Sequence, residues 1–212
     1  MTFLVVAAWE PELERFRASA GLAAGVVMET LGVGVVEASI AMTRCIARHR
    51  PAAALLLGTC GAFTLPAGIV VVGSSVRLVE GGIVDGHAAL PAPMPAAATF
   101  DPALHDVLVD AGAKSVQIAN TVGITTSDAL ASRLAATGDV EHLEAFAFAR
   151  ACAAAEGGPV PCVAALGVAN AVGARGRDEW LANHDSASAA AADLAWRAFA
   201  ALAAHAIAKR ER

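Results

Sequence analysis

Two carboxylates occupy positions where chemistry can be expected. Glu12 follows the apolar run at the start of the chain, and Glu144 interrupts the apolar stretch from Leu143 to Ala149. An ionised carboxylate can take a proton from water or accept hydrogen bonds from hydroxyl groups. A carboxylate inside an apolar run also needs a partner in the protein or a ligand. We therefore treat both residues as candidates for a functional site.

Other polar groups follow predicted strands but indicate less by themselves. They are the segment Gly58 to Gly61, the run Thr125 to Asp128, and Asn170. The segment Gly58 to Gly61 lacks the lysine of a phosphate-binding loop, and Gly32-Val33-Gly34 lacks the third glycine of a dinucleotide fingerprint. Cys60 could be a nucleophile, but no His lies in a recognisable partner position, so this interpretation is disfavoured.

Apolar runs alternate with helical patterns along the chain and would position these residues. The pattern predicts strands at 2–8, 26–31, 52–57, 68–79, 115–122 and 160–168, and helices at 11–18, 35–49, 141–155 and 185–209, with a short helix after 128. Residues 81–102, rich in Gly, Ala and Pro, are interpreted as an irregular loop. It is either a lid or partner-facing segment or a plain flexible surface loop.

Alternating strands and helices predict an α/β fold with a largely parallel central sheet, formed by a single domain over residues 1–212. Ligands bind such sheets at the carboxyl ends of the strands. The polar residues that follow the strands are therefore expected to meet in one site.

Composition excludes several classes of protein. The chain is 57% hydrophobic, but no apolar run approaches the ~20 residues that span a bilayer. The opening segment lacks the basic leader of a secretory signal. A net charge of −5, with Lys209 to Arg212 as the one short basic run, argues against nucleic acid. The four scattered cysteines predict neither a zinc site nor disulfides, which favours a reducing, cytoplasmic location.

Taken in order, several segments resemble the nucleoside phosphorylase/nucleosidase superfamily, most closely its futalosine hydrolase branch. The resemblance rests on the order and spacing of the motifs Ala7-Ala8-Trp9-Glu10-Pro11-Glu12, Leu31-Gly32-Val33-Gly34, Leu57-Gly58-Thr59-Cys60-Gly61-Ala62-Phe63 before Gly68 to Val72, Val140-Glu141-His142-Leu143-Glu144-Ala145, and Gly167-Val168-Ala169-Asn170 before Arg177-Asp178-Glu179-Trp180. It implies a three-layer αβα sandwich with a mixed, largely parallel sheet.

The resemblance also implies roles for particular residues. Glu12 would face the attacking water, Glu144 would bind the ribose hydroxyls, and Asn170 would bind the purine. The remaining substrate contacts would come from Leu143, His142, Cys60, Gly61, Thr125 and Thr126. The alternatives are structural: Glu12 as a first-turn helix residue, Asn170 as a helix cap, and His142 as a surface residue at a helix start.

Position 170 separates the branches of the family. Methylthioadenosine/S-adenosylhomocysteine nucleosidases carry Asp at this position, whereas Asn170 cannot supply a proton, although its amide can donate to N7 and O6 of a 6-oxopurine. We therefore expect a futalosine hydrolase that releases hypoxanthine for menaquinone biosynthesis. Leu143 and Ala145 replace the Met and Gly of many relatives, which affects the shape of the sugar pocket. Selectivity for the 5′ group would lie in the loop 81–102.

Three alternatives remain: a methylthioadenosine/S-adenosylhomocysteine nucleosidase, a purine nucleoside phosphorylase, and a non-catalytic nucleoside-binding protein. The phosphorylase is disfavoured because no Arg lies near residues 58–63, with Arg50 and Arg77 outside that segment. The resemblance further implies no cofactor and no metal, a small purine nucleoside as ligand, and a homo-oligomer, which we expect to be a dimer.

Overall fold

Strand residues alternate between two apolar layers, which explains how the helices are arranged. In the first strand, Leu4 and Val6 join one buried cluster while Phe3 and Val5 join another. Successive side chains of a strand point to opposite faces of a sheet. The sheet therefore has a covered core on each face, as its continuous apolar strands predict.

The structure is a computed structural model in which residues 2–20 and 25–210 are described, with side chains as far as residue 206. Its strands are β1 (Phe3–Ala7), β2 (Val26–Thr30), β3 (Ala53–Ala62), β4 (Val70–Leu78), β5 (Ala97–Thr99), β6 (Lys114–Asn120), β7 (Val140–His142) and β8 (Cys162–Ala171). Its helices are α1 (Pro11–Ala20), α2 (Val35–His49), α3 (Gly81–Val84), α4 (Pro102–Asp110), α5 (Asp128–Leu134), α6 (Ala145–Ala153) and α7 (Gly176–Arg210).

The sheet is mixed, as the resemblance implies. The strands follow the order β2-β1-β3-β7-β6-β4-β5, and β8 pairs with both β3 and β4. The pairs β1–β2, β1–β3, β3–β8, β4–β6 and β6–β7 are parallel, and β3–β7, β4–β5 and β4–β8 are antiparallel. The pairings of β3, β8, β4, β6 and β7 thus form a closed circuit, with β1 and β2 extending from it.

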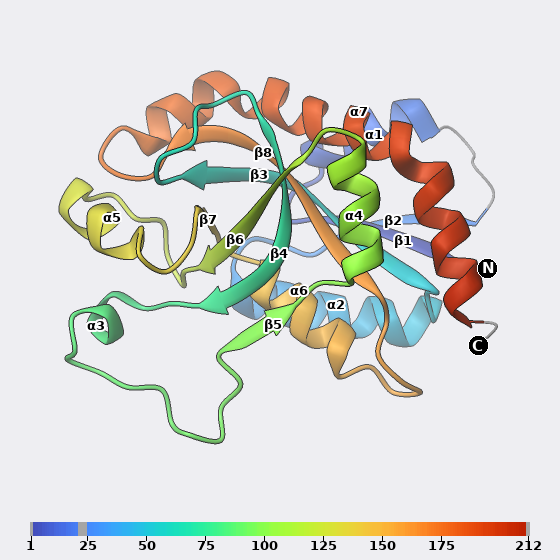
Figure 1. The fold of residues 1–212 in the computed structure, drawn as a ribbon, viewed down its shortest axis with the longest axis horizontal. Coiled ribbons are helices and arrows are strands. Elements are labelled where there is room, and N and C mark those ends of the chain that lie inside the picture. Colours follow the sequence, from blue (N-terminus) through green and yellow to red (C-terminus); the bar gives the residue numbers. More distant parts are fainter. Residues whose placement is uncertain (1, 21–24, 211–212) are drawn as a thin grey trace.

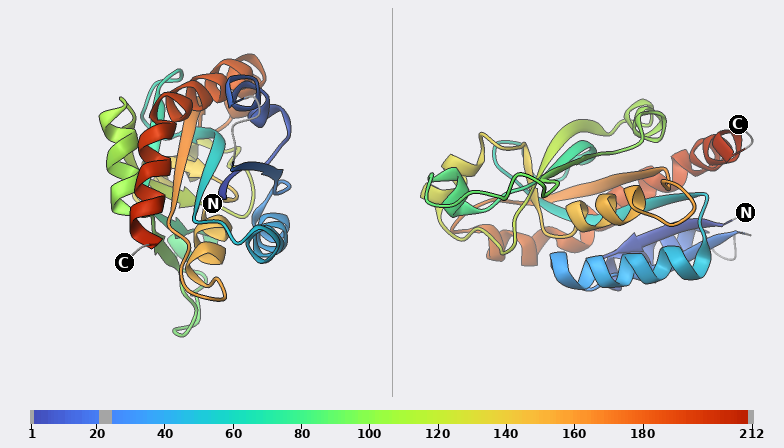
Figure 2. Two further views of the ribbon diagram at one scale, coloured as in Figure 1. Left: turned by 90° about the vertical axis from the view of Figure 1, so that its right-hand side faces the viewer. Right: turned by 90° about the horizontal axis from the view of Figure 1, so that it is seen from below.

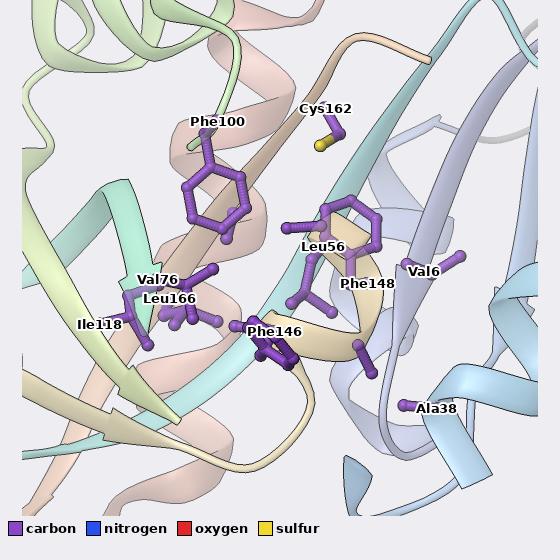
Figure 3. Packing of buried hydrophobic residues seen from close by; sticks show 14 of the residues in the cluster. Val6, Ala38, Leu56, Val76, Phe100, Ile118, Phe146, Phe148, Cys162 and Leu166 are labelled. Atoms are coloured by element: carbon purple, nitrogen blue, oxygen red, sulfur yellow. The ribbon is translucent and has the colours of Figure 1, made fainter. Parts of the chain in front are cut away.

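Helices cover both faces of the sheet (Figure 1; Figure 2, left). Helices α2 and α6 pack on the face that contains Leu4 and Val6, while α1, α4 and α7 pack on the opposite face. Phe146 and Phe148 of α6 fill the centre of the first cluster (Figure 3). The three-layer αβα sandwich is confirmed.

Strand ends lie further along the chain than the sequence predicts. Strand β3 extends through Gly58 to Ala62, and β8 extends through Asn170 to Ala171, because the two strands pair in parallel over their whole lengths. Asn170 therefore lies within a strand, and helix α7 begins only at Gly176. The interpretation of Asn170 as a helix cap is wrong.

The predicted helix at 141–155 begins too early. Residues 140–142 form β7, which pairs with β3 and β6, and the helix begins at Ala145. Sheet pairing here overrides the local helical pattern. His142 is 6% exposed, so its interpretation as a surface residue is also wrong.

Two further predictions need correction. The segment 81–102 is not entirely irregular, because it contains α3 and β5, and Asp101 and Pro102 start α4. The final helix begins nine residues earlier than 185, at Gly176, where Asp178 and Glu179 favour a helix N-terminus. The side chains of Lys209 to Arg212 lie outside the described part of the chain. Among the described residues, no helix is long and apolar enough to cross a membrane.

Candidate active site

A cavity of about 500 Å³ opens at the carboxyl ends of the strands. It gathers residues from the last part of β3, β7 and β8 and from the segments that follow β1, β2, β6, β7 and β8. Ligand sites of parallel sheets typically lie at this edge. Its lining comprises Ala8, Trp9, Glu12, Val33, Thr59, Cys60, Gly61, Ile124, Glu141, His142, Leu143, Glu144, Asn170, Gly176, Arg177 and Trp180. Segments far apart in the sequence therefore meet in one place.

Glu12 lies in the first turn of α1, and its carboxylate accepts hydrogen bonds from Thr59 of strand β3. The backbone N–H of Thr59 donates to Oε1 at 2.9 Å, and the Thr59 hydroxyl donates to the same oxygen at 3.0 Å. Burial raises the pKa of Glu12 from 4.5 to about 7, with the Glu144 charge adding to the rise and the Thr59 hydrogen bonds opposing it. Near pH 7 this carboxyl can therefore both accept and release a proton.

The Thr59 hydroxyl is itself oriented by Trp180 of α7. The indole Nε1–H of Trp180 donates to Thr59 Oγ1 at 3.1 Å. Because an indole N–H can only donate, it occupies a lone pair of the hydroxyl and leaves the hydroxyl proton for Glu12. Trp180 also stacks on His184, with ring centroids 4.3 Å apart, and lies 6.0 Å from Trp9. An aromatic group thus holds one wall of the cavity in place.

Glu144 is 4% exposed and lies at the N-terminus of α6. Its Oε1 accepts a hydrogen bond from the Gly34 backbone N–H at 2.6 Å. Gly34 has φ 92°, a left-handed conformation that glycine adopts without strain. The turn after β2, which the sequence marks with two glycines, therefore anchors the carboxylate that α6 presents to the cavity.

His142 lies beside Glu144 without forming an ion pair. Its Nδ1 accepts the backbone N–H groups of Glu144 and Ala145, each at 3.1 Å, so this nitrogen carries no proton. Burial lowers the pKa of His142, against the opposing effect of the Glu144 charge, and the ring is neutral near pH 7. The 3.2 Å approach of Nδ1 to Glu144 is thus a contact between two acceptors. The ring proton belongs to Nε2, on a residue that lines the cavity.

Asn120, which the sequence analysis did not single out, holds the turn that carries Glu144. This fully buried side chain donates to the Leu143 carbonyl at 3.1 Å and accepts the Phe146 N–H at 2.8 Å. A buried amide with both ends bonded fixes the backbone around it. The position of Asn120 at the end of an apolar strand was the available indication.

Asn170 reaches the cavity through an irregularity in the sheet. Cys60 pairs with Val168 but Gly61 pairs with Asn170, so Ala169 is an extra residue in β8. Such a bulge re-aims the side chains that follow it. A Cβ on Gly61 would lie 3.0 Å from Asn170 Nδ2, and one on Gly176 would lie 3.1 Å from it. Two glycines therefore make room for this amide.

The structure brings most of the sequence-predicted site residues together. Glu12, Asn170, Glu144, Leu143, His142, Cys60 and Gly61 all line the cavity. Cys60 is 3% exposed, and burial, followed by the Glu12 charge, raises the pKa of its thiol, which disfavours a thiolate nucleophile.

The segment Thr125 to Asp128 contributes differently from the prediction. Thr125 and Thr126 do not line the cavity, and the neighbouring Ile124 does. Thr125 is buried and donates from its hydroxyl and its backbone N–H to Glu141, which does line the cavity. Thr126 is exposed. Thr125 therefore positions Glu141, a residue of the cavity lining, and does not line the cavity itself.

Sequence reasoning missed several lining residues, among them Thr59, Glu141 and Arg177. Thr59 and Arg177 stand inside motifs that carried the resemblance, but their types gave no reason to select them. Within the described ranges, no group of three or more His, Cys, Asp or Glu residues could hold a metal ion.

The chain belongs to the phosphorylase superfamily, whose family model matches residues 5–200. The search of curated proteins found no match. Among solved structures, the fold is similar to a 5′-methylthioadenosine/S-adenosylhomocysteine nucleosidase from Neisseria meningitidis in complex with methylthio-immucillin-A, at 20% identity and a TM-score of 0.81. That match covers 93% of this chain and 98% of the other.

Two further solved structures share the fold. Futalosine hydrolase of Helicobacter pylori strain 26695 is 13% identical, with a TM-score of 0.81 over 92% of this chain and 95% of the other. A 5′-methylthioadenosine/S-adenosylhomocysteine nucleosidase from Colwellia psychrerythraea 34H in complex with adenine is 19% identical, with a TM-score of 0.83 over 95% and 96% of the two chains.

Proposed function

We propose that the protein is an N-glycosidic hydrolase of purine nucleosides and that futalosine is its substrate. The observation that carries this proposal is the meeting of Glu12, Glu144 and Asn170 in one cavity at the carboxyl ends of the strands. The solved relatives, which include nucleosidases of both kinds, support it.

The proposed reaction uses Glu12 as the general base. A water oxygen forms a bond to C1′ of the ribose while the C1′–N9 bond breaks, and the water proton passes to Glu12. The electron pair of the broken bond goes to the purine, which takes up a proton from solvent. A pKa of about 7 suits Glu12 to accept this proton near neutral pH.

Glu144 is assigned to the sugar. The Gly34 N–H occupies one lone pair of its Oε1, which leaves further acceptor sites for the 2′- and 3′-hydroxyls of ribose. A carboxylate bound to these hydroxyls favours the positive charge that develops on the ribose in the transition state.

Asn170 is assigned to the purine. One of its amide N–H groups donates to the Ala171 carbonyl at 2.8 Å, so a single N–H is left for the ligand rather than the pair that the sequence suggested. That N–H can donate to N7 but cannot protonate it. A leaving group that tolerates the absence of an acid, such as hypoxanthine with its 6-oxo group, is therefore favoured over adenine.

Water is favoured over phosphate as the nucleophile. Arg177 is the one Arg or Lys side chain among the cavity residues, and it follows Gly176, which lies beside Asn170 rather than beside Glu12. A phosphate that attacks C1′ would need cations on the Glu12 side. The phosphorylase is the alternative that this arrangement disfavours.

The proposal includes a cytoplasmic homodimer. The four cysteines are free, which suits a reducing compartment. Val33, Val36 and Ile40 are 63%, 65% and 44% exposed, and Val33 also lines the cavity. An apolar surface of this kind next to the cavity suits a contact with a second copy.

A substrate panel tests the proposal. Futalosine, inosine, methylthioadenosine and S-adenosylhomocysteine are incubated with the protein, with and without phosphate, and free base is measured by chromatography. We expect hypoxanthine from futalosine without phosphate. Adenine release would favour the methylthioadenosine nucleosidase, phosphate dependence would favour the phosphorylase, and no release would leave a binding protein.

A further inference from the structure

The purine end of the cavity lacks a hydrogen-bond donor if Asn170 acts alone. A 6-oxopurine presents two acceptors, N7 and O6, on the edge that Asn170 would face, whereas adenine presents an acceptor at N7 and a donor at N6. Because one N–H of Asn170 already donates to Ala171, the side chain can serve only one of the two acceptors. If the bound base is a 6-oxopurine, O6 therefore needs a donor from another residue.

Arg177 is placed at this end of the cavity. It follows Gly176, whose Cβ position would lie 3.1 Å from Asn170 Nδ2, and both residues line the cavity. Its near neighbour Arg175 does not line the cavity and instead pairs with Glu179 at 3.4 Å. The two arginines therefore differ in position although both stand near the start of α7.

Each of the three carboxylates of the lining accepts a hydrogen bond from the protein. Glu12 is bound by Thr59, Glu141 by Thr125, and Glu144 by the Gly34 backbone. Arg177 is exposed, and it takes part in none of the ion pairs found among the described residues. A permanent cation with five N–H donors is therefore available to a ligand.

We propose that Arg177 donates to the 6-oxo group of the bound purine and so selects 6-oxopurines over 6-aminopurines. This inference rests on the proposed function and names the class of base that the site takes. As the C1′–N9 bond breaks, its electron pair enters the purine ring, and part of the negative charge reaches O6. The guanidinium stabilises that charge, which compensates for the acid that Asn170 cannot provide. The 6-amino group of adenine offers Arg177 no acceptor.

Binding of free bases tests this inference without any turnover. The affinities of the protein for hypoxanthine and for adenine are measured by isothermal titration calorimetry. The unchanged protein is compared with Arg177→Gln and with the matched control Arg175→Gln. A charge-assisted hydrogen bond predicts that Arg177→Gln binds hypoxanthine about 10- to 100-fold more weakly, with adenine changed less than about 2-fold. Arg175→Gln should bind both bases as the unchanged protein does.

Several results would overturn the inference. They are equal weakening of both bases by Arg177→Gln, the same effect from Arg175→Gln, or an unchanged protein that does not prefer hypoxanthine to adenine. If the predicted binding pattern is found but no nucleoside is hydrolysed, the proposed enzymatic function fails while the selection by Arg177 stands. The two conclusions are therefore tested separately.

Discussion

At the scale of single residues, the burial of Glu12 suits its proposed role as a base and carries a cost in stability. The residue is 9% exposed, and burial raises the pKa of its carboxyl to about 7 although Thr59 donates two hydrogen bonds to it. Desolvation thus outweighs hydrogen bonding at this position. A structural carboxylate would be expected to have its pKa lowered by such bonds, so the observed direction favours a functional role.

Replacing Glu12 by Gln should stabilise the protein above neutral pH. Between pH 4.5 and about 7 the folded state holds a proton at Glu12 that the unfolded state releases, so the free energy of unfolding falls as the pH rises through this window. Glu12→Gln removes that loss and should gain up to about 3 kcal/mol at pH 8 and nothing below pH 4.5. Urea unfolding at both pH values measures this, and a variant less stable at pH 8 would contradict it.

Thr59 sets the proton affinity of Glu12 through its hydroxyl. Thr59→Val keeps the shape and the backbone N–H but removes a hydrogen bond that lowers the pKa of Glu12. In this variant, the pH at which kcat/KM reaches half of its plateau should move upward from about 7, whereas Thr59→Ser should leave it in place. The pH dependence of hydrolysis measures the shift.

The contribution of Trp180 can be separated by combining variants. Trp180→Phe removes the N–H that orients the Thr59 hydroxyl and should move the same midpoint upward by a smaller amount. Because Trp180 acts through Thr59, it should add no further shift in the Thr59→Val background. If the two substitutions shift the midpoint of the pH profile additively, Trp180 does not act through the Thr59 hydroxyl.

At the scale of elements, the close pairing of β3 with β8 at Gly61 positions the side chain of Asn170. A Cβ on Gly61 would lie 2.9 Å from Val172 Cγ2 and 3.0 Å from Asn170 Nδ2. Overpacking of this kind typically costs about 1–3 kcal/mol. Because the added methyl group would displace the Asn170 amide from its position in the cavity, Gly61→Ala should lower kcat/KM by roughly 10-fold or more, measured with futalosine.

A matched control is available for this glycine. A Cβ on Gly123 would have no atom within 4 Å, so Gly123→Ala should leave kcat/KM unchanged. Equal activities of the two variants would show that Asn170 does not need its present position.

The elements also show what the sequence can and cannot predict. Periodicity predicts β1, α2, β4 and β6 well, because apolar spacing reports which face of an element is buried. It does not predict β7 or the extension of β8 to Asn170, since both depend on pairing with strands distant in the sequence.

Some residues of the candidate site can likewise be recognised from the sequence, and others cannot. Glu144 is recognisable because a carboxylate inside an apolar run is unusual. Glu12 is recognisable only from its place after the first strand and from the family resemblance. Thr59 and Trp180 are not, because their importance comes from a hydrogen bond that joins residues 121 positions apart. Arg177 has an ordinary type and a helical position, and only the cavity distinguishes it from Arg175.

At the scale of the whole molecule, helix α7 is fixed to the sheet at one very close approach. A Cβ on Gly167 of β8 would clash with the backbone carbonyl group of Ala187 in α7. To relieve this clash, the backbone of β8 or of α7 would have to move, which would separate the sheet from the helix. Because α7 also carries Arg177 and Trp180 to the cavity, this contact joins the stability of the fold to the site.

Gly167→Ala should therefore destabilise the protein by more than about 2 kcal/mol, as strained core substitutions do. Thermal unfolding followed by circular dichroism measures the change, with Gly123→Ala as the control. A melting temperature equal to that of the control would show that α7 can move away from β8 freely.

The central claim, that Glu12 activates water for cleavage of a purine nucleoside, is tested most directly by hypoxanthine release from futalosine in phosphate-free buffer at pH 8. The unchanged protein and Glu12→Gln are compared at equal concentration. We predict steady release by the unchanged protein and a rate at least about 100-fold lower for Glu12→Gln, whose fold the unfolding measurement verifies. Equal rates in the two proteins would contradict the claim.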